Sequence, residues 1–424
     1  MNTIIGGSEL SGTIQIPPSK SVAHRLLICA ALSKHNSVIK CESLNDDIIS
    51  TYKALNNIGA NIHYENGHFY VEPINEILKG NTIDCNESGS TLRFLISIFC
   101  ALGTNSTFIG KGNLPSRPMN NIYDILIDKG IILTKLSKYE LPVECIGKLN
   151  PGKYVIKGNI SSQYLTGLLF ALPLLDGDSE IEIDGDLSSE SYINITLSTL
   201  KLSGIEILVN DNKYYIKGNQ TYNIPEFVEV EGDWSSAAFW LVAGVIGKHP
   251  IIIEGLNLDS KQGDKKIIDC LRLMGGKIEC IENKIISYPS ILNPIDLDCS
   301  DIPDLLPILS VAASTCIGKT KLKNVGRLRF KECNRLEATK ELLNHYNIIC
   351  NITSNDFIIN GNNITSNDYI SVSTFNDHRI AMAASVAACR CKNPVIIRNA
   401  EAVNKSYPEF FNDYNKLGGQ ANVL

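Results

Sequence analysis

The sequence predicts an α/β protein built from six copies of one unit of about 70 residues. Six times, a helix-like segment ends in Leu or Tyr, three further residues and a Gly (Tyr in the fifth copy), and an apolar residue three positions later starts a strand. These Gly or Tyr positions are 59, 130, 204, 275, 346 and 418, at spacings of 71, 74, 71, 71 and 72 residues. Glycine commonly ends a helix because it lacks a Cβ and enters the left-handed region without a clash. Such a period indicates one supersecondary unit repeated along the chain.

Each unit is expected to hold a second helix, which begins in a short polar loop. The predicted starts of these helices are at Ser19, Ser88, Ser161, Asp233, Asp301 and Asp377. Segments such as FLISIFCAL are apolar on nearly all sides, so these helices should be buried, and none is long enough to cross a bilayer. The helices that end in Gly are more mixed and suit the surface. With β-rich runs such as YVIKG and IEIDG between the helices, each unit is predicted to be β-α-β-α-β-β.

Composition favours a two-domain, enzyme-sized protein. The chain has 424 residues, 44% of them hydrophobic, and its net charge of −6 argues against nucleic acid as the main partner. Thirteen Cys residues show no C-x-x-C pair and no metal-ligand spacing, which favours reduced thiols in the cytoplasm and no bound metal. The N-terminus lacks a signal-peptide pattern, so no membrane partner is expected. P-loop and dinucleotide signatures are absent, so no cofactor is expected.

The residues with chemical potential gather where loops enter the buried helices. A helix N-terminus offers free backbone N–H groups and the positive end of the helix dipole, so it binds anions. In the first copy, Lys20 and Ser21 stand at the predicted helix start and Arg25 lies about one turn inside. Two cations and hydroxyls in that position suit a phosphate or carboxylate, although an ordinary Ser N-cap followed by a solvated Lys would give the same pattern.

The same arrangement recurs in the other copies. A helix start disfavours a cation unless an anion binds there. The cations at or near such starts are Lys20, Arg25, Arg93, Arg117, Lys331, Arg335, Arg379 and Lys405. On an acidic chain this pattern predicts a strongly positive cleft for a small, multiply anionic substrate.

Two carboxylates are predicted to complete the site. Asp304, about four residues into an apolar helix, is either an exposed cap residue or a general base facing the cleft. Glu332 lies between Lys331 and Arg335, whose charges favour its ionised form. Two carboxylates among several cations suit proton transfer to and from a phosphate-bearing substrate. His378 either orients or relays a proton, or is a packed histidine at a helix cap.

Nine segments, in order along the chain, carry a family resemblance. They are PPSKSVAHR, ESGSTLRFL, LPSRPM, SSQYLTGLL, VEGDWSSAAFWLVAG, DIPDLLPIL, RFKECNRLEA, FNDHRIAMA and KSYPEFF. Together they resemble the successive motifs of the 3-phosphoshikimate 1-carboxyvinyltransferases, or 5-enolpyruvylshikimate-3-phosphate synthases, from about residue 5 to 415. The resemblance implies a two-domain inside-out α/β barrel of six β-α-β-α-β-β repeats, three per domain. One domain would comprise residues 1–18 plus 232–424 and the other 19–231, with the active site in the interdomain cleft.

The resemblance also implies a reaction. The carboxyvinyl (enolpyruvyl) group of phosphoenolpyruvate would pass to the 5-hydroxyl of shikimate 3-phosphate through a tetrahedral intermediate, with release of phosphate, in the shikimate pathway to aromatic amino acids. Asp304 matches the carboxylate that activates the hydroxyl, Glu332 the group that gives and takes the methylene proton, and Lys20 the cation shared by both ligands. Domain closure would bring Lys20 and Asp304 together. The protein would be a monomer with small-molecule substrates alone.

Binding residues carry over position by position. The shikimate 3-phosphate pocket is matched by Lys20, Ser21, Arg25, Ser161, Ser162, Gln163, Ser189, Asp304 and Lys331. The phosphoenolpyruvate pocket is matched by Lys20, Gly89, Arg117, Gln163, Arg335, Arg379 and Lys405. Supporting positions are His378, Tyr192 and Arg93.

Two positions depart from the family pattern. Glu87 stands where many relatives have Asn, and Arg93 is its expected partner. Asn334 replaces an Asp close to Glu332, and this loss of charge is expected to shift the pKa of Glu332 or loosen its neighbours without abolishing activity. Gly89 is kept, which implies that glyphosate inhibits by competing with phosphoenolpyruvate.

Three other functions stay open on the residues alone. UDP-N-acetylglucosamine 1-carboxyvinyltransferase shares the fold but carries a Cys in the loop where this chain has Asn113–Arg117. The RNA 3′-phosphate cyclases use a related repeat but need a catalytic His and a nucleotide. A non-catalytic phosphometabolite-binding protein would use the same scaffold, but it would not call for both Asp304 and Glu332.

Overall fold

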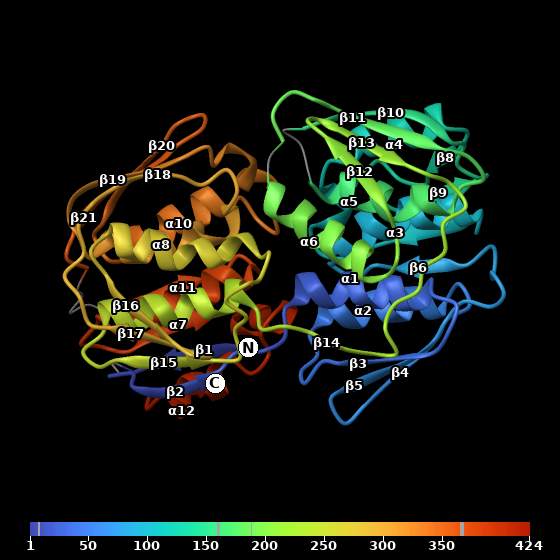
Figure 1. The fold of residues 1–424 in the computed structure, drawn as a ribbon. Coiled ribbons are helices and arrows are strands. Elements are labelled where there is room, and N and C mark those ends of the chain that lie inside the picture. The colour runs from blue at the N-terminus through green and yellow to red at the C-terminus, as the bar shows by residue number, and fades with distance from the viewer. Residues whose placement is uncertain (7–8, 159–161, 188, 365–368) are drawn as a thin grey trace. The chain divides into compact units, whose positions relative to one another are not determined.

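A computed structural model describes residues 1–6, 9–158, 162–187, 189–364 and 369–424 (Figure 1). The chain divides into two compact units. The terminal unit comprises Met1–Pro17 and Glu231–Leu424, and the middle unit comprises Pro18–Val230. Among the described residues, no helix has the length and apolar character that a membrane span requires.

The described strands form six four-stranded sheets with one common plan. The third copy shows it, with elements β10 (Gly152–Lys157), α5 (Ser162–Ala171), β11 (Ser179–Asp184), α6 (Glu190–Leu202), β12 (Ile207–Asn210) and β13 (Lys213–Ile216). Strand β10 runs parallel to β11, β11 runs antiparallel to β13, and β13 pairs antiparallel with β12. A parallel pair needs a crossover, which α5 supplies, whereas the outer pair closes as a hairpin. This is the β-α-β-α-β-β unit that the sequence predicts.

Two more repeats are continuous in the chain. The second copy contains β6 (Thr82–Asp84), α3 (Gly89–Leu102), β7 (Ser106–Ile109), α4 (Asn120–Asp128), β8 (Ile132–Lys135) and β9 (Val143–Ile146). The fifth copy contains β18 (Asp296–Asp298), α9 (Leu306–Ser314), β19 (Ile317–Lys323), α10 (Arg335–Asn344), β20 (Ile349–Ile352) and β21 (Phe357–Asn362).

The other three repeats are each completed by a strand from a distant part of the chain. The first copy contains α1 (Lys20–Ala31), β3 (Ser37–Lys40), α2 (Asp46–Asn56), β4 (Asn61–Glu65) and β5 (His68–Glu72), and is completed by β14 (Phe227–Glu229). The fourth contains α7 (Trp234–Ile246), β15 (Ile251–Glu254), α8 (Ile267–Leu273), β16 (Lys277–Ile281) and β17 (Lys284–Tyr288), and is completed by β2 (Gly12–Gln15). The sixth contains β22 (Ile370–Ser373), α11 (His378–Ala388), β23 (Val395–Arg398), α12 (Phe410–Lys416) and β24 (Ala421–Val423), and is completed by β1 (Asn2–Ile5). The N-terminal strands β1 and β2 therefore belong to the same unit as the C-terminal half.

The helix boundaries follow local sequence signals. Ser88, Asp233 and Asp377 are N-caps whose side-chain oxygens accept backbone N–H bonds in the first turn. The repeated Gly positions 59, 130, 204, 275 and 418 have positive φ. In the fifth copy Asn347, next to Tyr346, takes this left-handed conformation with a φ of 58°.

The predicted start of the fifth inner helix at Asp301 was wrong. Helix α9 begins at Leu306, after a short 3-10 turn, η4 (Pro303–Leu305). Ile302 precedes a proline, which disfavours helical backbone, and its φ of −127° and ψ of 45° are not helical. Asp304 consequently lies in the turn and not inside a helix.

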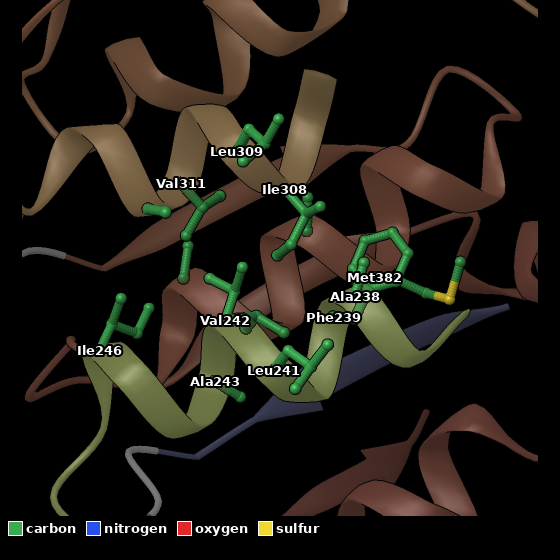
Figure 2. Close-up of a cluster of buried hydrophobic side chains, with 14 of the residues drawn as sticks. Ala238, Phe239, Leu241, Val242, Ala243, Ile246, Ile308, Leu309, Val311 and Met382 are labelled. Atoms are coloured by element: carbon green, nitrogen blue, oxygen red, sulfur yellow. The ribbon is translucent and has the colours of Figure 1, made fainter. Parts of the chain in front are cut away.

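Each unit buries its three inner helices. In the terminal unit, α7, α9 and α11 are buried along their whole lengths. Figure 2 shows Val242 of α7 facing Ile308 and Val311 of α9. In the middle unit, α3 and α5 approach closely, because a Cβ on Gly167 would lie 2.5 Å from the backbone oxygen of Arg93. This close packing places the polar residues at the starts of α3 and α5 side by side.

Candidate active site

Arg335 is the centre of a buried charge cluster in the terminal unit. Its side chain is 1% exposed and donates from Nη1 to Asp304 Oδ1 (2.8 Å), from Nε to Asp377 Oδ2 (2.9 Å) and from Nη2 to Glu332 Oε2. Burial alone would lower the pKa of Arg335, but Asp377, Glu332 and Asp304 outweigh it and hold that pKa well above its ordinary value. The permanent cation fixes Asp304 and Glu332 relative to each other.

Asp304 is shared by cations from three segments of the chain. Its Oδ1 also lies 3.4 Å from Lys331 Nζ, and its Oδ2 accepts from Arg379 Nη2 at 3.1 Å. The Asp304 side chain is 12% exposed, so it is not completely buried. A carboxylate held in one orientation suits a general base.

Lys331 is a partly buried cation whose charge is easily lost. Burial lowers its pKa to about 8, with Arg335 and Arg327 adding to the shift and Asp304 and Glu332 opposing it. Lys331 therefore titrates close to physiological pH, unlike an ordinary lysine.

The start of α11 gathers the remaining predicted groups of this unit. Asp377 caps the helix by accepting from the Arg379 N–H (2.9 Å). His378 is buried, with Nδ1 4.0 Å from Asp377 Oδ1. Lys405 Nζ donates to the Asn376 carbonyl at 2.7 Å. The backbone thus brings Arg379 and Lys405 to one end of α11, beside the carboxylates of the cluster.

In the middle unit, Arg25 is held by neutral acceptors. It donates to Thr196 Oγ1 (2.9 Å) and to the carbonyls of Ser21 (2.6 Å) and Tyr192 (3.0 Å), and its guanidinium lies 5.0 Å from the Phe94 ring centroid. Burial lowers the pKa of Arg25 to about 10, so the group is still charged at neutral pH. A buried cation with neutral partners retains its attraction for an anion.

Gly89 lies against two arginines. A Cβ at this position would be 2.7 Å from Arg117 Nη1 and 2.9 Å from Arg93 Nη1, so a side chain would displace both. Arg93 Nη1 donates to Gln163 Oε1 (2.8 Å), and Gln163 Nε2 donates to Ser90 Oγ (3.0 Å). The structure therefore groups predicted residues from α3, α5 and the loop before α4.

The two departures from the family pattern have local explanations. Arg93 was predicted to pair with Glu87, and this was wrong: Arg93 donates to Gln163, while the Glu87 carboxyl lies against Gly112, where a Cβ would be 2.4 Å from its Cδ. Asn334 is the N-cap of α10, and its side chain accepts from the Glu337 N–H (3.4 Å). Asn keeps the capping oxygen that Asp would supply.

The remaining predicted residues fall into three groups. Ser162, in the first turn of α5, and Ser189, which precedes α6 with a φ of 58°, are buried. Ser161 lies outside the described residues. Three cations do not stand at helix starts as predicted. Arg117 follows the 3-10 turn η1 (Leu114–Ser116), Lys331 follows the 3-10 turn η5 (Gly326–Phe330), and Lys405 ends the 3-10 turn η6 (Ala400–Lys405).

Sequence reasoning missed the partner of Lys20. Lys20 Nζ pairs with Asp47 Oδ2 at 2.8 Å, and both side chains are mostly buried. In the sequence, Asp47 looks like an ordinary acid in the first turn of a helix, so no local signal marked it. Next to this pair, burial, Lys20 and Arg25 lower the pKa of His24 well below its usual range, which keeps that ring neutral.

A family model for EPSP synthase (3-phosphoshikimate 1-carboxyvinyltransferase) matches residues 4–414 of the chain. The chain belongs to this family. A 3-phosphoshikimate 1-carboxyvinyltransferase of Clostridium botulinum (strain Alaska E43 / Type E3) is 44% identical over 420 residues, which are 97% of this chain and 96% of the relative. One of Clostridioides difficile (strain 630) is 44% identical over 425 residues, with the same coverage.

Solved structures show the EPSP synthase fold. An EPSP synthase from Acinetobacter baumannii superposes with a TM-score of 0.81 at 23% identity, covering 100% of both chains. The enolpyruvyl transferase NikO from Streptomyces tendae superposes with a TM-score of 0.79 at 16% identity, covering 99% of this chain and 98% of the other. The predictions of the family, the two-domain α/β fold and a transferase function are confirmed.

Proposed function

We propose that this chain transfers the carboxyvinyl group of phosphoenolpyruvate to the 5-hydroxyl of shikimate 3-phosphate and releases phosphate. Membership of the EPSP synthase family supports the reaction. The geometry that best supports the residue roles is the Arg335 cluster, which holds Asp304 and Glu332 among cations. We also propose, from the thirteen free thiols, most of them buried, that the protein works in the reducing cytoplasm. We further propose that it is a monomer.

In the addition step, the oxygen of the 5-hydroxyl of shikimate 3-phosphate forms a bond to C2 of phosphoenolpyruvate, and Asp304 accepts the proton of that hydroxyl. Glu332 donates a proton to C3, which turns the methylene into a methyl group. In the elimination step, the bond from C2 to the phosphate oxygen breaks and Glu332 takes a proton back from C3. The double bond re-forms, and in the net balance the hydroxyl proton leaves with phosphate.

The cations of both units have complementary roles in this proposal. Arg335, Arg379 and Lys405 would bind the carboxylate and phosphate of phosphoenolpyruvate, together with Gly89, Arg117 and Gln163. Lys20, Ser21, Arg25, Ser161, Ser162, Gln163, Ser189 and Lys331 would bind shikimate 3-phosphate. Charge that develops on the tetrahedral intermediate would then be stabilised by these cations, which lowers the barrier.

Phosphate release by the purified protein tests the proposal. The assay would supply phosphoenolpyruvate with shikimate 3-phosphate, or with UDP-N-acetylglucosamine as the alternative acceptor. It would also compare Asp304→Asn with Asp296→Asn, since Asp296 is an exposed carboxylate paired with Lys323 on the same repeat. We expect release that requires shikimate 3-phosphate and is lost only in Asp304→Asn. Release with the UDP-sugar alone, or full activity of Asp304→Asn, would overturn it.

A further inference from the structure

Asp264 is a buried carboxyl group to which the proposed reaction assigns no role. It lies in the 3-10 turn η3 (Gly263–Lys266) and is 3% exposed. Its Oδ2 accepts from the hydroxyl of Ser235 in the first turn of α7, and its Oδ1 is buried with no hydrogen-bond partner in the part of the chain that the structure describes. A buried carboxylate with one unsatisfied oxygen is costly, whereas a protonated carboxyl group is much less so.

The charges that face Asp264 also favour its protonated form. Burial is the largest effect, and the carboxylates of Asp304 on η4 and Asp233 at the start of α7 add to it. Arg379 of α11 and the Ser235 hydroxyl act in the opposite direction. Together these effects raise the pKa of Asp264 to about 7, which agrees with an Oδ1 that accepts no hydrogen bond from the described residues.

The other titratable groups around η3 do not neutralise Asp264. Lys265 Nζ donates to the Leu258 carbonyl, and Lys266 Nζ pairs with Asp301 Oδ2 at 2.8 Å. Cys270 on α8 interacts electrostatically with Asp264. Burial raises the pKa of its thiol to about 12, so the thiol is neutral. Arg379 is therefore the cation whose positive charge would stabilise an ionised Asp264.

We propose that Asp264 is a positioning residue whose protonated form leaves the charge of Arg379 to Asp304 and the anionic substrate. This inference rests on the proposed function, in which Arg379 binds phosphoenolpyruvate. If Asp264 loses its proton, the new negative charge offsets part of the field of Arg379, with which it interacts electrostatically, and repels an incoming anion. Affinity for phosphoenolpyruvate should therefore fall as Asp264 ionises, while bond making and breaking continue unchanged.

The test compares KM for phosphoenolpyruvate and kcat from pH 6 to 8.5 in four proteins. They are the wild type, Asp264→Asn, Ser235→Ala and the control Asp269→Asn, which removes an exposed carboxylate from neighbouring α8. Asp264→Asn imitates the protonated acid, so its KM at pH 8.5 should be about threefold to tenfold below that of the wild type, with equal values at pH 6. Asp269→Asn should follow the wild type. Ser235→Ala removes a donor that favours the ionised form, so its rise in KM should move to higher pH.

Infrared spectroscopy supplies a readout that does not depend on turnover. The C=O stretch of a protonated carboxyl group should be present in the wild type at pH 6, absent from Asp264→Asn, and lost on titration with a midpoint near pH 7. If the wild type catalyses transfer but its KM profile against pH is superimposable on that of Asp264→Asn, this inference is overturned and the proposed function stands. An Asp264 that is ionised at pH 6 would have the same consequence. No transfer by the wild type would overturn the proposed function as well. If Asp264→Asn fails to fold, the shift in Ser235→Ala decides.

Discussion

The two units hold their buried arginines in different ways. In the middle unit, Arg25 donates to a hydroxyl and two carbonyls, and Arg93 donates to a Gln amide oxygen, so these positive charges have neutral partners. In the terminal unit, Arg335 bridges three carboxylates and Arg379 pairs with Asp304. These arginines of the middle unit therefore keep their charge for an anion, although Lys20 of the same unit pairs with Asp47. The terminal unit instead balances charge among groups that can exchange protons.

The difference indicates that the buried arginines serve ligand binding in the middle unit and stability and protonation in the terminal unit. The charge of a cation with neutral partners is not neutralised by the protein and remains available to attract an anionic ligand. A cation among carboxylates stabilises the fold and sets the geometry and protonation of its neighbours. Loss of a cation should then weaken binding in the middle unit but weaken folding in the terminal unit.

Replacing the central arginine of each unit gives the largest contrast. Arg335→Met would leave three carboxylates without their shared cation, and we expect it to lose about 3–5 kcal/mol of unfolding free energy together with all activity. Arg25→Met removes donors from neutral acceptors, so we expect a loss of about 1–3 kcal/mol and a strong loss of shikimate 3-phosphate affinity. Urea denaturation and calorimetric binding measure the two quantities. Equal losses of stability would contradict the comparison.

The proton-transfer role of the terminal unit predicts a large effect on rate alone. Glu332→Gln keeps a hydrogen-bonding oxygen for Arg335 but has no exchangeable acid proton, so we expect kcat to fall about 10²–10⁴-fold. Binding of shikimate 3-phosphate should change little. The control is Glu337→Gln, an exposed carboxylate two residues into α10. Steady-state kinetics of the two variants would refute the role of Glu332 if their kcat values matched.

In the middle unit, substrate binding should depend on the volume left for the ligand and not on proton transfer. In Gly89→Ala the new Cβ would push on Arg117 and Arg93, which it would approach to 2.7 and 2.9 Å. We expect KM for phosphoenolpyruvate to rise about tenfold, because the anion and the methyl group compete for the same volume. KM for shikimate 3-phosphate serves as the internal control and should hold. Glyphosate inhibition, proposed to compete with phosphoenolpyruvate in the wild type, should weaken in the same variant, and unchanged inhibition would count against a shared site.

The repeats were predictable because each depends on local signals. An apolar helix after a polar loop recurs in every copy, and a Gly after a mixed helix recurs in every copy except the fifth, which has Tyr346. Local backbone preferences fix both. The closing strands were not predictable in this way. β1, β2 and β14 pair with segments far along the chain, and short strands such as NTII and FVE carry no mark of their partner.

The site shows the same division. Arg335 was found because cations at helix starts are unusual and need a reason. Asp304 was found as a lone carboxylate in an apolar segment, and Glu332 as an acid between two cations. Asp47 and Asp264 were missed, because an acid in a helical first turn or in a short polar loop is common. What distinguishes Asp264 is the burial of its carboxyl group and the unsatisfied Oδ1, and both depend on residues distant in sequence.

Lys331 is the exception in the terminal unit, since it is a proposed ligand-binding cation with a weakened charge. Its pKa of about 8 lies below the ordinary 10.5, so the charge is complete near pH 7 and is lost as pH rises through 8. We expect KM for shikimate 3-phosphate to rise about twofold between pH 7 and pH 8. In Lys331→Arg the group stays charged and this rise should vanish, whatever the variant's absolute KM.

Stability should change in the opposite direction over a different pH window. The folded pKa of Lys331 lies below the unfolded value, so between about pH 8 and 10.5 the unfolded chain binds more protons at this position. The unfolding free energy contributed by Lys331 therefore increases with pH across that window, and in Lys331→Met the increase should be absent. Urea denaturation of both proteins at pH 8 and pH 10 measures it, with Lys323→Met on the exposed face of β19 as control. If Lys331→Met kept the full increase, the buried environment of Lys331 could not be its source, and the weak-cation account of the twofold KM change would fail with it.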